Sequence, residues 1–360
     1  MQLCRAQALH ALSISSVALL LAAGGTACLA QAASAAAPVT PPAPQSITID
    51  AYVTDKMGHH QSGLGAQDFT LLDNKHPARI LDIKEVDGRN GADPVRVLIV
   101  IDAINTDFTV VAQERGQLMD FLNQDGGRLA HPTALAVLTE KGIKTEQNFT
   151  TDGAVLSASM AKFQNDLRTA TRSAGFWGAT ERLQWSLNEL GQLTAYEAGL
   201  PGRKLAIFIS PGWPMLPWAA NDATEKQLKW VFSTIEAFSN QLREGHVTLY
   251  AIDPYILGRT DPFFYESYLK GITKTNDAEY GNLALQVLAA HSGGLVLDSG
   301  LADVKGGINN AIRDANACYT ITFAAPPVDG PNEYHDLHLQ VDKPGAVVRT
   351  TAGYYSNVQR

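Results

Sequence analysis

An apolar run near residue 100 most constrains how this chain can fold. Residues 95–101 read Val-Arg-Val-Leu-Ile-Val-Ile, include five β-branched side chains, and are followed directly by Asp102. Such a run predicts a strand buried on both faces, as in the parallel sheet of an α/β protein. Ligands of these sheets bind beyond the carboxyl ends of the strands. The sequence therefore places Asp102 where a functional site is expected.

Residues 94–316 continue this pattern of alternating strands and helices. Further strands are predicted at Ala134–Leu138, Ile143–Phe149, Leu205–Ile209, Val247–Ile252 and Gly294–Leu297. Helices are predicted near Val111–Leu122, up to Leu193 along the stripe of Leu183, Leu187 and Leu190, over the stripe from Leu228 to Leu242, and at Asp303–Ala315. The pattern predicts a doubly wound, mostly parallel, Rossmann-like α/β sheet with right-handed crossovers.

The two flanking segments, 46–90 and 317–357, alternate apolar and polar residues with a period of two. Ile47, Ile49 and Val53 show this near one end, and Tyr319, Ile321 and Phe323 near the other. Either segment is too short to bury a core of its own. We therefore expect them to form one discontinuous, immunoglobulin-like β-sandwich, into which the α/β domain is inserted.

The first 32 residues have the character of a signal peptide. Arg5 precedes the apolar segment Leu12–Leu21, and Ala30-Gln31-Ala32 offers a small-x-small cleavage site. Gly24-Gly25-Thr26 interrupts the run before it could span a membrane. The prediction is export to the periplasm or the cell exterior, followed by a Pro/Ala-rich linker at 33–45. Lipoprotein anchoring at Cys28 is the alternative, although Gly25 stands where such sites have Leu.

Charge and cysteine content exclude several classes of partner. Removing residues 1–32 takes away Arg5 and no acid, which changes the formal charge from −8 to −9. Such a chain is not expected to bind nucleic acid or an anionic membrane surface. Cys318 is the one cysteine beyond the presequence, so neither an intrachain disulfide nor a cysteine metal cluster is expected in the mature chain.

Several short motifs, in order along the chain, resemble one known family. They are Tyr52–Gly58 with Gly63-Leu64, Asp68-Phe69-Thr70, Asn148–Asp152, Ile207–Pro214 and Gly345–Tyr355. Together they make the mature chain similar to the von Willebrand factor type A domain proteins, and more narrowly to the secreted acidobacterial-type VWFA-related proteins. The resemblance implies the α/β domain, the terminal sandwich and a role in adhesion.

The resemblance also implies a metal-ion-dependent adhesion site for Mg²⁺ or Mn²⁺. Asp102, Thr106 and Thr180 match three of its ligands, while Ile104 and Pro211 stand where the family has a Ser and an Asp. Because two of five ligands are lost, we interpret the site as degenerate and expect no cofactor. The structural alternative is that Thr180 caps a helix and that Asp102, Asn105 and Thr106 satisfy backbone groups of a turn.

Aromatic side chains are frequent in the loops that follow the predicted strands. With Asn105, the candidate partner-binding residues are Phe176, Trp177, Trp213, Met215 and Trp218. Such residues beside a rigid sheet are typical of a protein-binding surface. The alternative is that several of them fold inward as a small core.

No enzyme motif is present: the chain has no nucleophile elbow, phosphate loop, dinucleotide fingerprint or His-Glu-x-x-His. His59-His60 lies in a turn, and His335 and His338, three apart on a strand, point to opposite faces. We interpret the chain as an exported, non-catalytic binding module with a protein partner. The alternatives are a functional Mg²⁺- or Mn²⁺-dependent site that binds an acidic partner residue, and a hydrolase with an unrecognised site.

Overall fold

The computed structural model describes residues 45–89, 95–145, 148–163, 175–215, 223–255, 264–297, 302–327, 330 and 332–356. The predicted signal peptide and nearly all of the linker lie outside these residues. Residues from Pro44 to Arg360 form one compact unit. Within the described ranges, no helix combines the length and apolar character that a membrane span needs.

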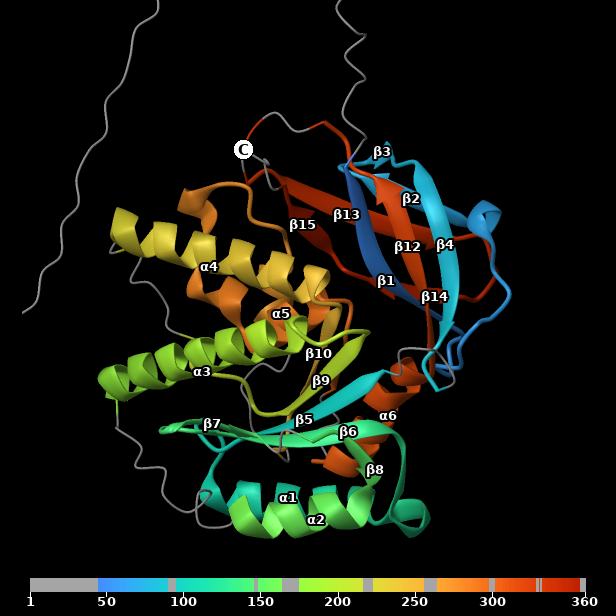
Figure 1. Cartoon of the computed structure of the whole chain (residues 1–360). Coiled ribbons are helices and arrows are strands. Elements are labelled where there is room, and N and C mark those ends of the chain that lie inside the picture. The colour runs from blue at the N-terminus through green and yellow to red at the C-terminus, as the bar shows by residue number, and fades with distance from the viewer. Residues whose placement is uncertain are drawn as a thin grey trace, which may run out of the picture. The chain divides into compact units, whose positions relative to one another are not determined.

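A seven-stranded sheet forms the centre of the molecule (Figure 1). Its order is β11-β10-β9-β5-β6-β7, and β8 pairs with β6. The strands are β5 (Arg96–Asp102), β6 (Arg128–Thr139), β7 (Gly142–Thr145), β8 (Thr150–Asp152), β9 (Lys204–Ile209), β10 (Val247–Ile252) and β11 (Val296–Leu297). The five strands from β11 to β6 are parallel, and β7 and β8 run antiparallel to β6.

Helices cover both faces of this sheet, as a doubly wound fold requires. They are α1 (Phe108–Leu122), α2 (Gly153–Lys162), α3 (Gly175–Ala198), α4 (Glu225–Glu244), α5 (Leu285–His291) and α6 (Val304–Asn316). Along β5, Leu98 and Val100 join the core packed by α3, α4 and α5, whereas Val97, Ile99 and Ile101 join the core packed by α1, α2 and α6. The predicted mixed α/β fold with a mostly parallel sheet is confirmed.

Two four-stranded antiparallel sheets contain strands from both ends of the chain. Their orders are β14-β1-β12-β4 and β15-β13-β2-β3. The strands are β1 (Ser46–Thr54), β2 (Phe69–Asp73), β3 (His76–Pro77), β4 (Ile80–Asp87), β12 (Ala317–Ala324), β13 (Tyr334–Val341), β14 (Val347–Thr350) and β15 (Gly353–Tyr355). Both sheets contribute to one core, which includes Ile49, Leu71, Ile321, Leu339 and Tyr354. The two end segments thus complete each other, while the domain boundaries themselves stay a prediction.

Two elements differ from the predicted ones. The strand expected at Ile143–Phe149 ends at Thr145, because β7 is the return arm of a hairpin with β6. The helix expected to open at Thr180 begins at Gly175 instead, so Thr180 lies in its second turn and is not its N-cap. Gly178 is buried within α3, where packing outweighs the low helix propensity of glycine.

Candidate functional site

Asp102 ends β5 at the carboxyl edge of the sheet and is fully buried. Its Oδ1 accepts hydrogen bonds from the backbone N–H groups of Ile104, at 2.9 Å, and Asn105, at 3.0 Å. These bonds fold residues 102–105 into a tight turn, in which the carboxylate takes the place of a backbone acceptor. Asp102 therefore shapes the loop that follows the central strand.

The second carboxylate oxygen of Asp102 is also fully bonded. Oδ2 accepts from Nδ2 of Asn105 at 2.8 Å and from Oγ of Ser210 at 2.6 Å. Four donors thus occupy about as many lone-pair positions as a carboxylate has. Burial raises the pKa of the Asp102 carboxyl, and the hydrogen bonds from Ser210 and Asn105 oppose that shift by stabilising the charged form.

Ser210 is a site residue that the sequence reasoning missed. It follows β9, which neighbours β5 in the sheet, and the carboxyl ends of the two strands therefore meet. Ser210 Oγ also accepts from the N–H of Gly212 at 2.9 Å, which closes the turn through Pro211. The available signal was a hydroxyl residue placed directly after a buried parallel strand.

Asn105 ties this loop to α3. Its Nδ2 donates to Ser186 Oγ at 2.9 Å as well as to Asp102. Ser186 lies on α3 six residues beyond Thr180, so the structure brings Asp102 and Asn105 together and supplies Ser186 as the α3 contact. Thr106 is buried beside them, and its hydroxyl has no hydrogen-bond partner within the described part of the chain.

Glu114 is a second buried acid near this edge. It lies on α1, is 1% exposed, and neither of its carboxylate oxygens has a hydrogen-bond partner among the described residues. Burial, assisted by the negative charges of Asp102 and Asp253, holds the pKa of Glu114 well above its usual range. The surroundings of Glu114 thus favour the protonated, uncharged form of its carboxyl.

The donor set does not fit a Mg²⁺ or Mn²⁺ adhesion site. Hard cations need oxygens with free lone pairs and more than one negative charge. The four hydrogen bonds to Asp102 occupy its lone pairs, and Ile104 and Pro211 bring no side-chain oxygen. Within the described ranges, no group of three or more His, Cys, Asp or Glu side chains is arranged to hold a metal ion.

The predicted surface position of Trp213 is wrong. Trp213 is 3% exposed, packs in the core that includes α3 and α4, and donates from Nε1 to the Leu283 carbonyl at 2.8 Å. The turn at Pro211-Gly212, where Gly212 has φ +81°, directs the indole inward. The indole can be buried at little cost because its N–H group has a hydrogen-bond acceptor.

Of the other candidate contact residues whose side chains the structure describes, Trp177 is the most exposed aromatic one. It lies in the first turn of α3 and is 77% exposed. Met215 is half-buried, whereas Trp218 and the side chain of Phe176 lie outside the described residues. Phe108, the first residue of α1, is 56% exposed, and Asp107 before it is held by hydrogen bonds to and from the Tyr255 hydroxyl.

Of the paired histidines, His335, His338 and His59 lie as predicted, whereas His60 is partly buried, contacts Glu85 and stacks on Tyr319. His335 is buried and its Nδ1 lies 2.8 Å from Asp73 Oδ1, while His338 on the same strand is exposed. His59, in the turn after β1, contacts Asp55 at the surface. The prediction that His335 and His338 occupy opposite faces of β13 is confirmed.

Comparison with known proteins finds similarity to solved structures at low sequence identity. No family model matches the chain, and no curated protein sequence matches it either. A crystal structure of the pilus adhesin SpaC from Lactobacillus rhamnosus GG is similar at 9% identity with a TM-score of 0.36, over 83% of this chain and 50% of the adhesin. The TFIIH p34 N-terminal domain is similar at 13% identity with a TM-score of 0.23, over 45% of this chain and 81% of that domain. This chain thus spans about half the length of the adhesin.

Proposed function

We propose that this chain is an exported, non-catalytic binding protein of the von Willebrand factor A type, which contacts a protein partner without a metal ion. The contact surface is the edge of the sheet where the parallel strands end. The observation that carries this proposal is the closed hydrogen-bonding of Asp102: its four lone-pair positions are used within the chain.

The exposed aromatic residues at the helix starts supply the contacts in this proposal. Trp177 lies in the first turn of α3 and Phe108 is the first residue of α1, and both side chains are more than half exposed. The Asp107–Tyr255 hydrogen bonds hold the start of α1 at the sheet edge, and the Asn105–Ser186 hydrogen bond joins the middle of α3 to the loop after β5. Rigid aromatic anchors lose little conformational entropy on binding, which favours a protein interface.

A second candidate is a divalent-cation site that binds an acidic partner residue. The unpartnered oxygens of Thr106, Asn105 and Glu114 favour it, because unsatisfied buried oxygens are unusual and can be satisfied by a cation. For Asp102 to serve as a ligand, at least one of its four internal hydrogen bonds must break. The metal-free proposal needs no such rearrangement.

The proposal can be tested with a photo-crosslinking amino acid in place of Trp177. Trp230 on α4 is also a partly exposed tryptophan and provides the matched control position. We expect partner crosslinks from position 177 and not from position 230, in envelope extracts of the producing cell and equally with EDTA. A Phe108→Ala variant should weaken them. Crosslinking that is equal at both positions, or that EDTA abolishes, contradicts the proposal.

Export has its own test. The presequence proposal predicts that mature protein from the producing cell begins near Ala33, after cleavage behind Ala32. N-terminal sequencing that finds Met1 contradicts export by this route, and a lipid-modified Cys28 indicates the lipoprotein alternative.

A further inference from the structure

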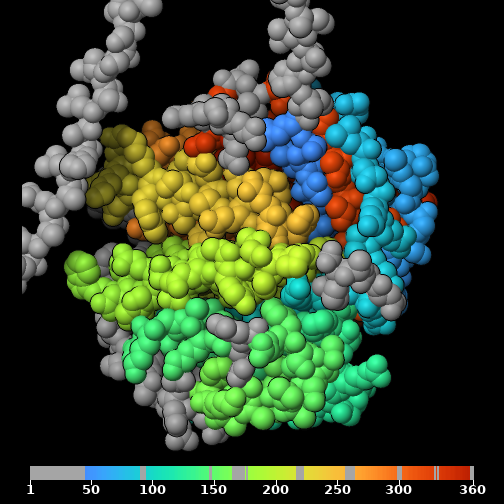
Figure 2. Space-filling view, viewed as in Figure 1, coloured from blue at the N-terminus to red at the C-terminus, as the bar shows by residue number. Residues whose placement is uncertain are grey.

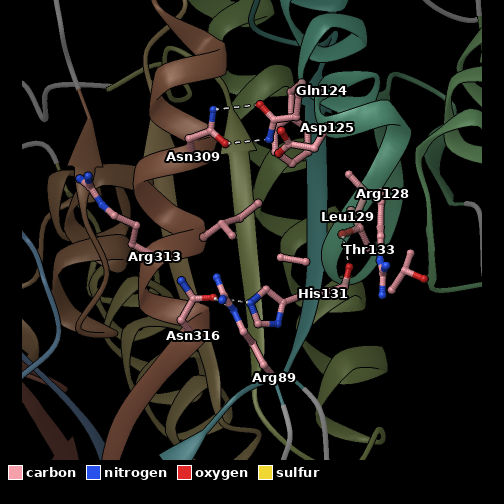
Figure 3. A pocket seen from close by; sticks show the side chains of 14 residues that line it. Arg89, Gln124, Asp125, Arg128, Leu129, His131, Thr133, Asn309, Arg313 and Asn316 are labelled. Atoms are coloured by element: carbon pink, nitrogen blue, oxygen red, sulfur yellow. Dashed lines mark hydrogen bonds between the residues drawn. The ribbon is translucent and has the colours of Figure 1, made fainter. Parts of the chain in front are cut away.

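A cavity of about 560 Å³ lies between α6 and the start of β6 (Figure 3). It is bounded by α6, by the start of β6, by β8 and by the chain just after β4. Asp102 pairs with Leu138 near the end of β6, whereas the cavity residues Arg128, His131 and Thr133 lie at its beginning. The cavity is therefore a site distinct from the proposed contact surface.

One end of the cavity is organised around Asn316, the last residue of α6. Asn316 Oδ1 accepts from Arg89 Nε at 2.7 Å and from His131 Nε2 at 3.0 Å. The oxygen of this amide is thus used within the chain, which leaves the Asn316 amide N–H and the outer nitrogens of Arg89 as donors at this end. Nδ1 of His131 is an acceptor there, and the exposed residue Arg128 lines the same cavity.

His131 is a buried imidazole at this end of the cavity. Its ring is 2% exposed, and Nδ1 has no hydrogen-bond partner in the described structure. Burial lowers the pKa of His131, and the charge of Arg89 lowers it further. Burial and the charge of Arg89 both favour the uncharged form of this imidazole.

The other end of the cavity is neutral and amide-rich. The side chains of Gln124 and Asn309 form a reciprocal amide pair, at 3.0 and 3.4 Å. Asp125 beside them is the one acid among the described lining residues. Figure 3 shows that Arg313 points away from the cavity across α6, so the positive charge is concentrated at the Arg89 and Arg128 end.

We propose that this cavity binds a small polar molecule whose oxyanion, a phosphate or carboxylate, lies between Arg89 and Arg128. Hydroxyl or amide groups of the same molecule would face Gln124 and Asn309. Guanidinium groups recognise both oxyanions through paired N–H donors. The cavity volume suits a small ligand. Because the whole chain has a net charge of −8, the cluster does not simply reflect an excess of basic residues.

The experiment is calorimetric titration of the full chain at low ionic strength, with inorganic phosphate in one arm and succinate in the other. We expect saturable binding of at least one probe at a single site, weakening as salt is added. Arg128→Gln should weaken binding of the probe at least tenfold, because it removes one of the two guanidinium groups. Arg128 is exposed, so this replacement leaves the packing intact. Arg79→Gln, at an exposed arginine just before β4, is the matched control and should bind like the wild type.

A second readout is the titration of His131 followed by NMR. A bound oxyanion offsets the arginine charge, so the pKa of His131 should rise with the probe present. The stronger probe identifies the oxyanion class. The proposal is overturned if neither probe gives saturable heat, or if Arg128→Gln and Arg79→Gln bind as the wild type does.

Discussion

Ser210 Oγ donates a 2.6 Å hydrogen bond to Asp102 Oδ2, although 108 residues separate the two along the chain. The contact exists because β5 and β9 are adjacent parallel strands that end at the same edge of the sheet (Figure 1). It changes the role of Asp102 from a candidate ligand to the acceptor around which two loops close.

The first prediction concerns the coupling between these two residues. Asp102→Asn should lower the free energy of unfolding by about 2–4 kcal/mol. The NH₂ group of the amide would face N–H and O–H donors, where the carboxylate oxygen accepted their hydrogen bonds. Ser210→Ala alone should cost about 1–3 kcal/mol. In a double-mutant cycle by urea unfolding the two costs should be non-additive by about 1 kcal/mol or more. Asp82→Asn, at an exposed position of β4, is the control and should be nearly neutral.

Two tryptophans should respond in opposite ways to truncation. Trp213→Ala removes a buried indole and its hydrogen bond to Leu283, and should cost about 3–5 kcal/mol of stability. Trp177→Ala, at a side chain that is 77% exposed, should change stability by no more than about 0.5 kcal/mol. Thermal and urea unfolding check both. Similar losses for the two variants would contradict the inward position of Trp213.

Glu197 should make stability depend on pH. It lies near the end of α3, and burial raises the pKa of its carboxyl to about 7, against the lowering effect of Lys204 and Arg96. Because the folded state holds the proton more tightly than the unfolded chain, this stabilisation is complete below about pH 4.5 and is lost as the pH rises through 7. As the pH rises from 4.5 to 8, the unfolding free energy of Glu197→Gln should therefore increase by about 1–3 kcal/mol relative to that of the wild type.

The measurement for Glu197 is the difference in unfolding free energy between variant and wild type at each pH. A matched replacement, Glu181→Gln at an exposed position of the same helix, should show no such trend. If the difference in unfolding free energy between Glu197→Gln and wild type does not change across this pH range, the raised pKa of Glu197 is contradicted.

Cys318 should be unreactive in the native protein. The thiol is buried in β12, and burial raises its pKa to about 12, so the thiolate is scarce at neutral pH. Iodoacetamide should label the peptide that contains Cys318 only at the rate of unfolding, as followed by mass spectrometry. Rapid labelling under native conditions would contradict the packing around β12.

The sequence predicted the sheet well because its signals are local. Residues 95–101 carry their own burial pattern, and β5 forms where that pattern places it, with Asp102 as its last residue. The pairing of the two end segments was predictable from their periodicity and from the shortness of each. These inferences need only the pattern of neighbouring residues and the rule that a short segment cannot bury a core by itself.

The site was less predictable because it depends on contacts distant along the chain. Ser210 meets Asp102 only once β9 is placed beside β5, and the burial of Trp213 depends on the Leu283 carbonyl. The sequence shows how many aromatic residues a loop contains, but it does not show which way each side chain points. The sequence showed the similarity to a metal-ion-dependent adhesion site, but it did not show the four hydrogen-bond donors around Asp102.

Titration of the full chain with Mg²⁺ and Mn²⁺, by calorimetry and by thermal unfolding, tests the central claim most directly. With the lone pairs of Asp102 occupied by four hydrogen bonds, we predict no saturable heat and no rise in Tm at millimolar metal concentrations. Saturable binding that raises Tm, and that Asp102→Asn abolishes in a variant that still folds, would contradict the claim and restore the metal-dependent site.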